Sequence, residues 1–238
     1  MVGREKVTVA GWGRIVVSIR AAFRAECATL GGVLRGLEPA DLDRPTDCPP
    51  WAVRDLVAHV ATGAGRLVDM LAAPAPPRAE VDAAGYFGAA KFAPEVDRAR
   101  IDSARRSARE LPDPAAVAAG FDRAWRSTDE AVARQPAGRL VRTRHGDAMT
   151  LTDFLVTRVV EVGVHGLDLA AALGREPWLT PAAAEAVAPL LTGGRVVPTE
   201  LGWDRLTLVG KATGRVPLID RERTVTESAG IRWPTFGG

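Results

Sequence analysis

Three ionisable side chains share one stripe of the apolar stretch "FLVTRVVEVGVHGLDLAAAL", residues 154–173. Glu161, His165 and Asp168 are spaced by four and three residues, so in a helix they fall within about 60° of one another. A surface helix usually has a polar face wider than its apolar stripe, and here the polar stripe is the narrow one. It therefore faces water through a slit or an internal polar cavity. In the plainer alternative it is a thin solvated face on which Arg158 pairs with Glu161.

His59 could complete a metal site with this stripe. It lies in another apolar, helix-like stretch, residues 51–73, where Gly63 leaves room beside the imidazole. His59, Glu161 and His165 would offer two imidazoles and one carboxylate, and three protein ligands leave coordination positions open, as in catalytic sites. This donor set suits Zn²⁺, and also Fe²⁺ or Ni²⁺. From spacing alone, an ordinary core or surface histidine remains the alternative for His59.

Two further residues bear on this site. Asp168 lies one turn beyond His165, where it could orient that imidazole by a hydrogen bond or act on a substrate. His145, the only other histidine, lies in the turn-rich stretch "RTRHGDAMT", and we expect it not to bind the metal.

Helices are the elements that must position these residues. Residues 51–73 predict one helix that begins after two prolines, residues 95–111 a charged solvated helix, and Asp113 an N-cap for the next helix. Thr180 and the proline after it open another short helix, and for residues 203–210 we favour a helix over a strand. Apolar side chains recur at helical spacing in two further stripes: Val16, Ile19, Phe23, Cys27, Leu30, Leu34 and Leu37 in the first helix, and Val117, Phe121, Trp125 and Val132 after Asp113.

These segments predict a mainly all-α fold, an antiparallel four-helix bundle over residues 14–175 with a small C-terminal extension, residues 176–238. A long Pro/Gly/Ala-rich connection, residues 74–94, carries Tyr86 and Phe87. They would line a pocket or plug the end of the bundle, and we favour the plug.

The composition and net charge limit the kinds of partner that we expect for the protein. The chain has 238 residues and a net charge of +2, from 31 basic and 29 acidic residues, which favours neither nucleic acid nor a membrane as partner. We see no signal peptide and no apolar run long enough to span a membrane. Cys27 and Cys48 form neither a metal-ligand spacing nor a disulfide framework, which is typical of a reducing cytoplasm, and both are interpreted as structural. We expect a cytoplasmic monomer or homodimer.

The sequences of three stretches resemble those of a known family. "LDRPTDCPPWAVRDLVAHVATG" and "MTLTDFLVTRVVEVGVHGLDLAAALG" resemble the mycothiol-dependent maleylpyruvate isomerase family, a branch of the DinB-like metal-binding bundles. "LGWDRLTLVGKATGRVPL" resembles the C-terminal segment of many members. The resemblance covers roughly residues 14–238. It departs at "DCPPW", where many members have glycine before the tryptophan, and in a C-terminal part shorter than that of the full-length isomerases.

The resemblance implies a metal held by His59, Glu161 and His165, with functional roles for Asp168 and for a C-terminal arginine that matches Arg215. It also implies mycothiol as a low-molecular-weight thiol cosubstrate. A thiol on Zn²⁺ is deprotonated, and the thiolate would attack a small electrophilic substrate. The outcome would be S-transfer, or cis–trans isomerisation of the maleylpyruvate type. Two alternatives stay open: a non-catalytic DinB-like protein whose metal only staples the bundle, and a metal-dependent hydrolase that activates water.

Overall fold

The fold is mainly helical, as predicted. A computed structural model of the chain describes residues 9–88 and 93–234, with side chains from residue 19 onwards. The strands are β1 (Leu140–Arg142) and β2 (Ala148–Thr150). The helices in chain order are α1 (Val9–Arg35), η1 (Pro39–Asp43), α2 (Val53–Gly65), α3 (Leu67–Ala72), α4 (Ala83–Tyr86), α5 (Pro94–Arg109), α6 (Pro114–Ala133), α7 (Leu151–Leu173), α8 (Pro181–Leu191), η3 (Thr199–Leu201), α9 (Arg205–Ala212) and α10 (Asp220–Ser228).

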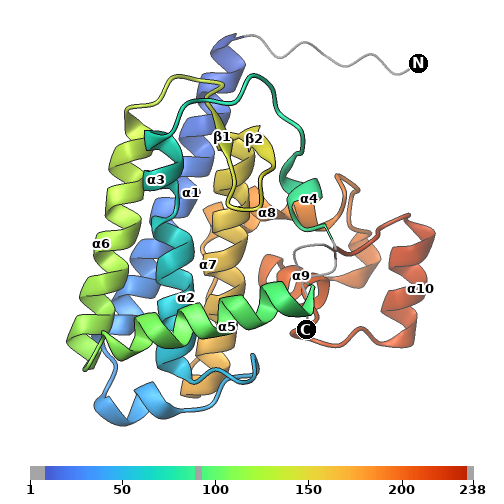
Figure 1. Ribbon diagram of the computed structural model, residues 1–238. Coiled ribbons are helices and arrows are strands. Elements are labelled where there is room, and N and C mark those ends of the chain that lie inside the picture. Colours follow the sequence, from blue (N-terminus) through green and yellow to red (C-terminus); the bar gives the residue numbers. More distant parts are fainter. Residues whose placement is uncertain (1–8, 89–92, 235–238) are drawn as a thin grey trace.

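Four helices pack around one core. Helix α1 contacts α6 and α7, and α2 contacts the same two helices from the other side. Figure 1 shows that α1 and α7 run in one direction and α2 and α6 in the other. Helix α5 packs across the outside of α2 and returns the chain to the end of the bundle where α6 begins. Polar side chains on one of these helices can therefore face the neighbouring helix across the core. Internal sites in helical bundles are built in this way.

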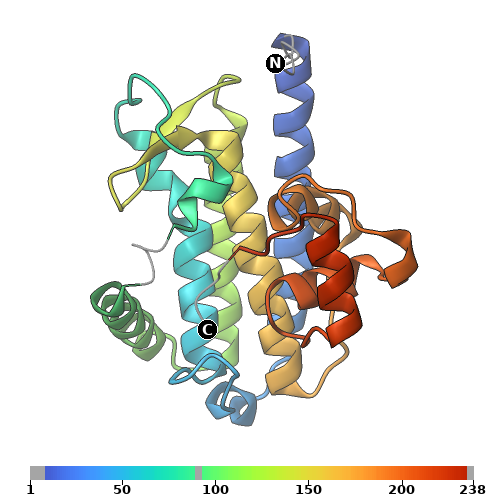
Figure 2. The ribbon, with the colours of Figure 1, turned by 90° about the vertical axis from the view of Figure 1, so that its right-hand side faces the viewer.

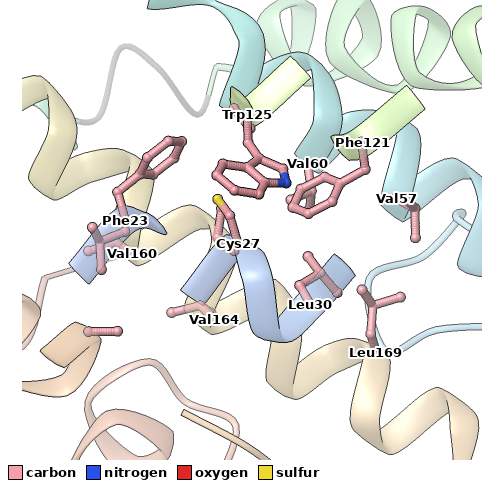
Figure 3. Packing of buried hydrophobic residues seen from close by; sticks show 14 of the residues in the cluster. Phe23, Cys27, Leu30, Val57, Val60, Phe121, Trp125, Val160, Val164 and Leu169 are labelled. Atoms are coloured by element: carbon pink, nitrogen blue, oxygen red, sulfur yellow. The ribbon is translucent and has the colours of Figure 1, made fainter. Parts of the chain in front are cut away.

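The core contains the side chains that the helical periodicity selects. Phe23 and Cys27 of α1 are fully buried, as is Phe121 of α6, and Trp125 is 5% exposed. Figure 3 shows the sulfur of Cys27 beside the indole of Trp125, between α1 and α6. Cys27 is therefore the small core residue that was predicted, and burial raises its pKa well above the usual thiol value. The side chain of Val16 lies outside the described residues.

Local capping signals explain where several helices begin. The carboxylate of Asp113 accepts a hydrogen bond from the backbone N–H of Ala116 at 2.8 Å, and Thr180 caps α8 by accepting from Ala183 at 3.2 Å. Helix α7 is capped by Thr150, whose hydroxyl accepts from the N–H of Asp153 at 3.0 Å. The predicted starts after Asp113 and at Thr180 are confirmed.

Two sequence predictions need correction. Residues 51–73 form two helices rather than one, because the chain breaks at Arg66 after Gly63 and Gly65. A Cβ at Gly65 would lie 3.3 Å from the side chain of Ala124, so the missing side chain also lets α2 approach α6 closely. The stretch "RTRHGDAMT" is more than a link, since β1 pairs antiparallel with β2 around its turn. Three-residue strands are too short to show an alternating pattern.

The C-terminal segments lie along one side of the bundle. Helix α8 packs on α1 and α7, and α9 packs on α8 and α7 (Figure 2). Residues 205–212 are helical, which confirms the choice of helix over strand. The boundary between residues 14–175 and 176–238 remains a prediction. Within the described residues, no helix has both the length and the apolar character required to cross a membrane.

Tyr86 covers the bundle near the start of α7. Helix α4 packs on α7, and the Tyr86 ring lies edge-on to Phe154 with ring centres 5.7 Å apart. Tyr86 is 8% exposed, so it packs as the favoured plug would. Its hydroxyl also accepts a 3.4 Å hydrogen bond from Arg158, which connects this packing to the polar stripe of α7.

Candidate metal centre

Three of the predicted site residues meet between α2 and α7. His59 comes from α2, and Glu161 and His165 from α7. One ligand atom of each lies within 4.8 Å of the others. Nε2 of His59 is 2.8 Å from Oε1 of Glu161, and the two imidazoles stand edge-on with ring centres 5.4 Å apart. Two nitrogen donors and one carboxylate oxygen at this separation fit a divalent transition-metal ion such as Zn²⁺.

Neighbouring residues hold this cluster in place. The indole of Trp51 stacks on His59, with ring centres 4.7 Å apart. Gly63 has no side chain, so Arg158 and Glu161 can lie close to it. A Cβ added at Gly63 would lie 3.0 Å from Arg158 Nη1 and 3.3 Å from Glu161 Oε1. The room that the sequence suggests beside His59 is therefore taken by the Glu161 carboxylate and its arginine partner.

The electrostatics suit metal ligation. Burial lowers the pKa of His59, although its bond to Glu161 opposes that shift. Burial alone would raise the pKa of Glu161, but Arg158 and His59 outweigh it and hold that pKa well below its usual range. The cluster therefore presents a neutral imidazole beside an ionised carboxylate, the protonation states that bind a cation.

The pairing of Arg158 with Glu161 exists, but not on a solvated face. Nη2 of Arg158 lies 3.5 Å from Oε2 of Glu161. Arg158 is only 3% exposed, so the pair lies under the bundle surface. The stripe is therefore not the solvated face of the plainer interpretation: Arg158 and Asp168 are buried, and the side chains of Glu161 and His165 are each only 17% exposed.

Asp168 lies at the centre of a second set of bonds. Its Oδ2 is 2.9 Å from Nδ1 of His165, and Arg215 donates to both carboxylate oxygens at 3.0 Å. Burial would raise the pKa of Asp168, yet the bonds from His165 and Arg215 lower it far below the ordinary value. With Nδ1 turned to Asp168, His165 keeps Nε2 for the cluster.

Cys48 also reaches this set, which sequence reasoning missed. Its Sγ–H donates to Oδ2 of Asp168 at 3.2 Å. Burial and the neighbouring Asp168 raise the pKa of Cys48 to about 12, so the thiol is protonated and a poor nucleophile. Its loop is held by Thr46, which accepts from the N–H of Cys48 at 3.2 Å and donates to the carbonyl of Trp51 at 2.8 Å. The loop thus brings Cys48 to Asp168 and Trp51 to His59.

The two remaining predicted residues, Arg215 and His145, are not members of the His59–Glu161–His165 cluster. Arg215 follows the turn at Gly214 and donates from Nη1 to the carbonyl of Thr213 at 2.8 Å. This bond orients the guanidinium group toward Asp168. His145 lies in the hairpin loop, where its ring is 6.3 Å from that of Tyr86. It lies apart from the cluster, and its exclusion as a ligand stays a prediction.

These features define a class: a helical-bundle protein with a histidine–glutamate–histidine cluster between two of its helices. A sequence profile described as "Mycothiol maleylpyruvate isomerase N-terminal domain" matches residues 23–170. The chain belongs to this family, which confirms the resemblance seen in the sequence.

Solved structures agree in fold. A crystal structure of the mycothiol-dependent maleylpyruvate isomerase is similar with a TM-score of 0.52 and 17% sequence identity, covering 74% of this chain and 69% of that one. A histidine-to-alanine mutant of that isomerase gives the same TM-score and coverage at 16% identity. No curated protein sequence matches the chain.

Proposed function

We propose that the chain is a metal-dependent enzyme that uses a low-molecular-weight thiol, mycothiol, as nucleophile on a small electrophilic substrate. The observation that carries the proposal is the cluster of His59, Glu161 and His165, whose ligand atoms lie within 4.8 Å of one another. Family membership supports the identity of the thiol. The ion is Zn²⁺ in this proposal, with Ni²⁺ or Fe²⁺ as alternatives.

A divalent ion bound here would keep a coordinated thiol deprotonated near neutral pH. The chain's own residues do the rest. His59 and Glu161 would hold the ion from facing helices, and Trp51 fixes the ring of His59 by stacking. In S-transfer the sulfur would form a bond to an electrophilic carbon as the bond from that carbon to its leaving group breaks. In isomerisation the sulfur would add to a carbon–carbon double bond, whose π electrons move away from the attacked carbon, and would leave again after rotation has occurred. In both cases the thiol proton goes to solvent.

Asp168 acts as a positioning residue in this proposal rather than as a base. A carboxylate that accepts bonds from His165, Arg215 and Cys48, and whose pKa is far below its ordinary value, is a weak proton acceptor. It instead orients the His165 ring, as carboxylates beside metal ligands do. Arg215 and Cys48 hold Asp168 in turn.

Cobalt substitution tests the proposal. Adding mycothiol to the Co²⁺-loaded protein should produce a sulfur-to-cobalt charge-transfer absorption and raise the melting temperature. Glu161→Ala should abolish the band. If the thiol changes neither the spectrum nor the melting temperature, the ion only stabilises the bundle or activates water, and the proposal is wrong.

The fate of the thiol separates the two reactions. S-transfer consumes one thiol for each product, whereas isomerisation returns it after the double bond has rotated. Free thiol measured before and after turnover distinguishes these outcomes for any electrophile that reacts.

A further inference from the structure

A cleft lies between the start of α2 and the last turns of α5. Helix α5 packs across the outside of α2 there (Figure 1). The cleft has a volume of about 310 Å³ and is lined by Arg54, Asp55, Arg105, Ala108 and Arg109. Three guanidinium groups and one carboxylate therefore share one small cleft on the outside of the bundle.

The lining residues of α5 lie on one face of that helix. Arg105 and Arg109 are four residues apart, so their side chains are neighbours one turn from each other, and like charges at this spacing repel. Ala108 lies between them and is 1% exposed, so its methyl group leaves space that a longer side chain would fill. Arg106 is on the same helix but does not line the cleft.

The carboxylates near the cleft offset its positive charge only in part. Asp55 already accepts from the N–H of Ala52 at 3.1 Å. Arg54 pairs with Asp43 at 2.8 Å, but the side chain of Asp43 is 75% exposed, and such solvent-exposed pairs are weak. Nε of Arg54 is buried and has no partner among the described residues.

The two arginines of α5 have no acidic partner. In the part of the chain that the structure describes, Arg105 and Arg109 form no ion pair. Arg105 donates from Nη2 to the carbonyl of Pro50 at 3.1 Å. Pro50 precedes Trp51, whose indole stacks on His59, so this bond also connects the cleft to the loop beside the metal cluster.

We propose that this cleft is a binding site for an oxyanion of the phosphate class. A phosphate group carries nearly two negative charges at neutral pH and offers at least three acceptor oxygens, which suits three guanidinium groups. A carboxylate has one charge and two oxygens and would leave part of the cleft unmatched. The volume is roughly ten times the share of one water molecule in the liquid, so a phosphate joined to a small organic group also fits.

A bound phosphate would join α5 to the start of α2 and would remove the repulsion between Arg105 and Arg109. Because Arg105 also holds the carbonyl of Pro50, the anion would strengthen the attachment of this loop to α5. Neither a metal ion nor a thiol takes part, so the site does not depend on the proposed function.

Calorimetric titration at low ionic strength tests the site, because salt screens exposed charges. Inorganic phosphate should bind saturably at one site per chain and raise the melting temperature, whereas acetate at the same ionic strength should do neither. Arg109→Gln should weaken phosphate binding about fivefold, and the double variant with Arg105→Gln should weaken it further. Arg106→Gln removes the same charge from α5 outside the cleft and should leave the affinity unchanged.

Titration with glycerol 3-phosphate separates a free ion from the phosphate group of a larger molecule. Tighter binding of the ester than of inorganic phosphate assigns the site to an organic phosphate, and binding that is no tighter assigns it to the free ion. Phosphate binding that does not saturate, or that weakens equally in Arg106→Gln and Arg109→Gln, would overturn the site. Binding that is lost in His59→Ala but kept in Arg109→Gln would place the anion on a metal ion and would overturn it as well.

Discussion

Asp168 and Arg215 form a two-bonded ion pair that joins α7 to the turn after α9. Nε donates to Oδ1 and Nη2 to Oδ2, both at 3.0 Å. Because Oδ2 also lies 2.9 Å from Nδ1 of His165, the pair connects the C-terminal part of the chain to an imidazole of the metal cluster.

We expect Asp168→Asn to retain the fold and at least part of the metal but to lose most turnover. The amide cannot match the charge of Arg215 or orient His165 as well, and such losses beside metal ligands cost about 10–100-fold in metal affinity or activity. Metal content, melting temperature and turnover are measured on one preparation. Asp129→Asn is the matched control, since it breaks the pair with Arg20 away from the site. Near-normal turnover in Asp168→Asn would leave Asp168 a purely structural role.

Metal content tests the ligand assignment. Purified protein should carry about one divalent ion per chain, and His59→Ala or Glu161→Ala should lose it. His145→Ala removes the histidine in the hairpin loop and should keep the ion. Elemental analysis of the four proteins decides the point. Full occupancy in His59→Ala, or a sharp loss in His145→Ala, would contradict the assignment.

Cys48 is expected to act as a hydrogen-bond donor to Asp168 rather than as a nucleophile. Cys48→Ser keeps a donor and should bind metal like the wild type. Cys48→Ala removes the donor and should weaken metal binding about twofold to tenfold, the range for one hydrogen bond. Competition with a chromophoric chelator measures both affinities. Loss of all turnover in Cys48→Ser with metal affinity intact would instead indicate chemistry at the sulfur.

Gly63→Ala should weaken metal binding without unfolding the protein. The added Cβ would lie 3.0 Å from Nη1 of Arg158 and 3.3 Å from Oε1 of Glu161, so both side-chain ends must shift. Gly32→Ala is the control. Gly32 is an exposed α1 residue whose added Cβ meets only Arg35 at 3.9 Å, and the change should stabilise α1 by about 0.5–1 kcal/mol. Equal metal affinity in both variants would show that the ligands tolerate the methyl group.

Glu26→Gln should stabilise the protein at neutral and alkaline pH. Glu26 is fully buried, accepts from the N–H of Thr180 through Oε2, and leaves Oε1 without a partner among the described residues. Burial raises its pKa above the ordinary 4.5. A raised folded-state pKa means that the favourable contribution of the neutral acid is complete below the ordinary value and is lost as the pH rises through the folded-state pKa.

The neutral amide avoids that loss. The melting temperature of Glu26→Gln should therefore exceed that of the wild type at roughly pH 8. The difference should shrink when the pH falls below the ordinary pKa of glutamate. Glu130→Gln, at an exposed position of α6, should show no such trend. A constant difference across the pH range would mean that folding does not shift the pKa of Glu26.

Helical periodicity and end signals were sufficient to predict the main helices, and the spacing on α7 was sufficient to propose Glu161 and His165 as partners. The break at Arg66 was not predictable, because it depends on how closely α2 must approach α6. The bond from Cys48 to Asp168 joins residues 120 apart in the chain. No local pattern in the sequence reports such a pair.

The location of the ligands on α2 and α7 has a consequence for folding kinetics. Neither helix alone carries the whole cluster, so the cluster forms only after a long loop of chain has closed. In the unfolded ensemble the ligands are dispersed, and the free energy of metal binding then adds to the free energy of folding. Metal release should therefore be slow, limited by opening of the contact between α2 and α7, and chelators should accelerate global unfolding.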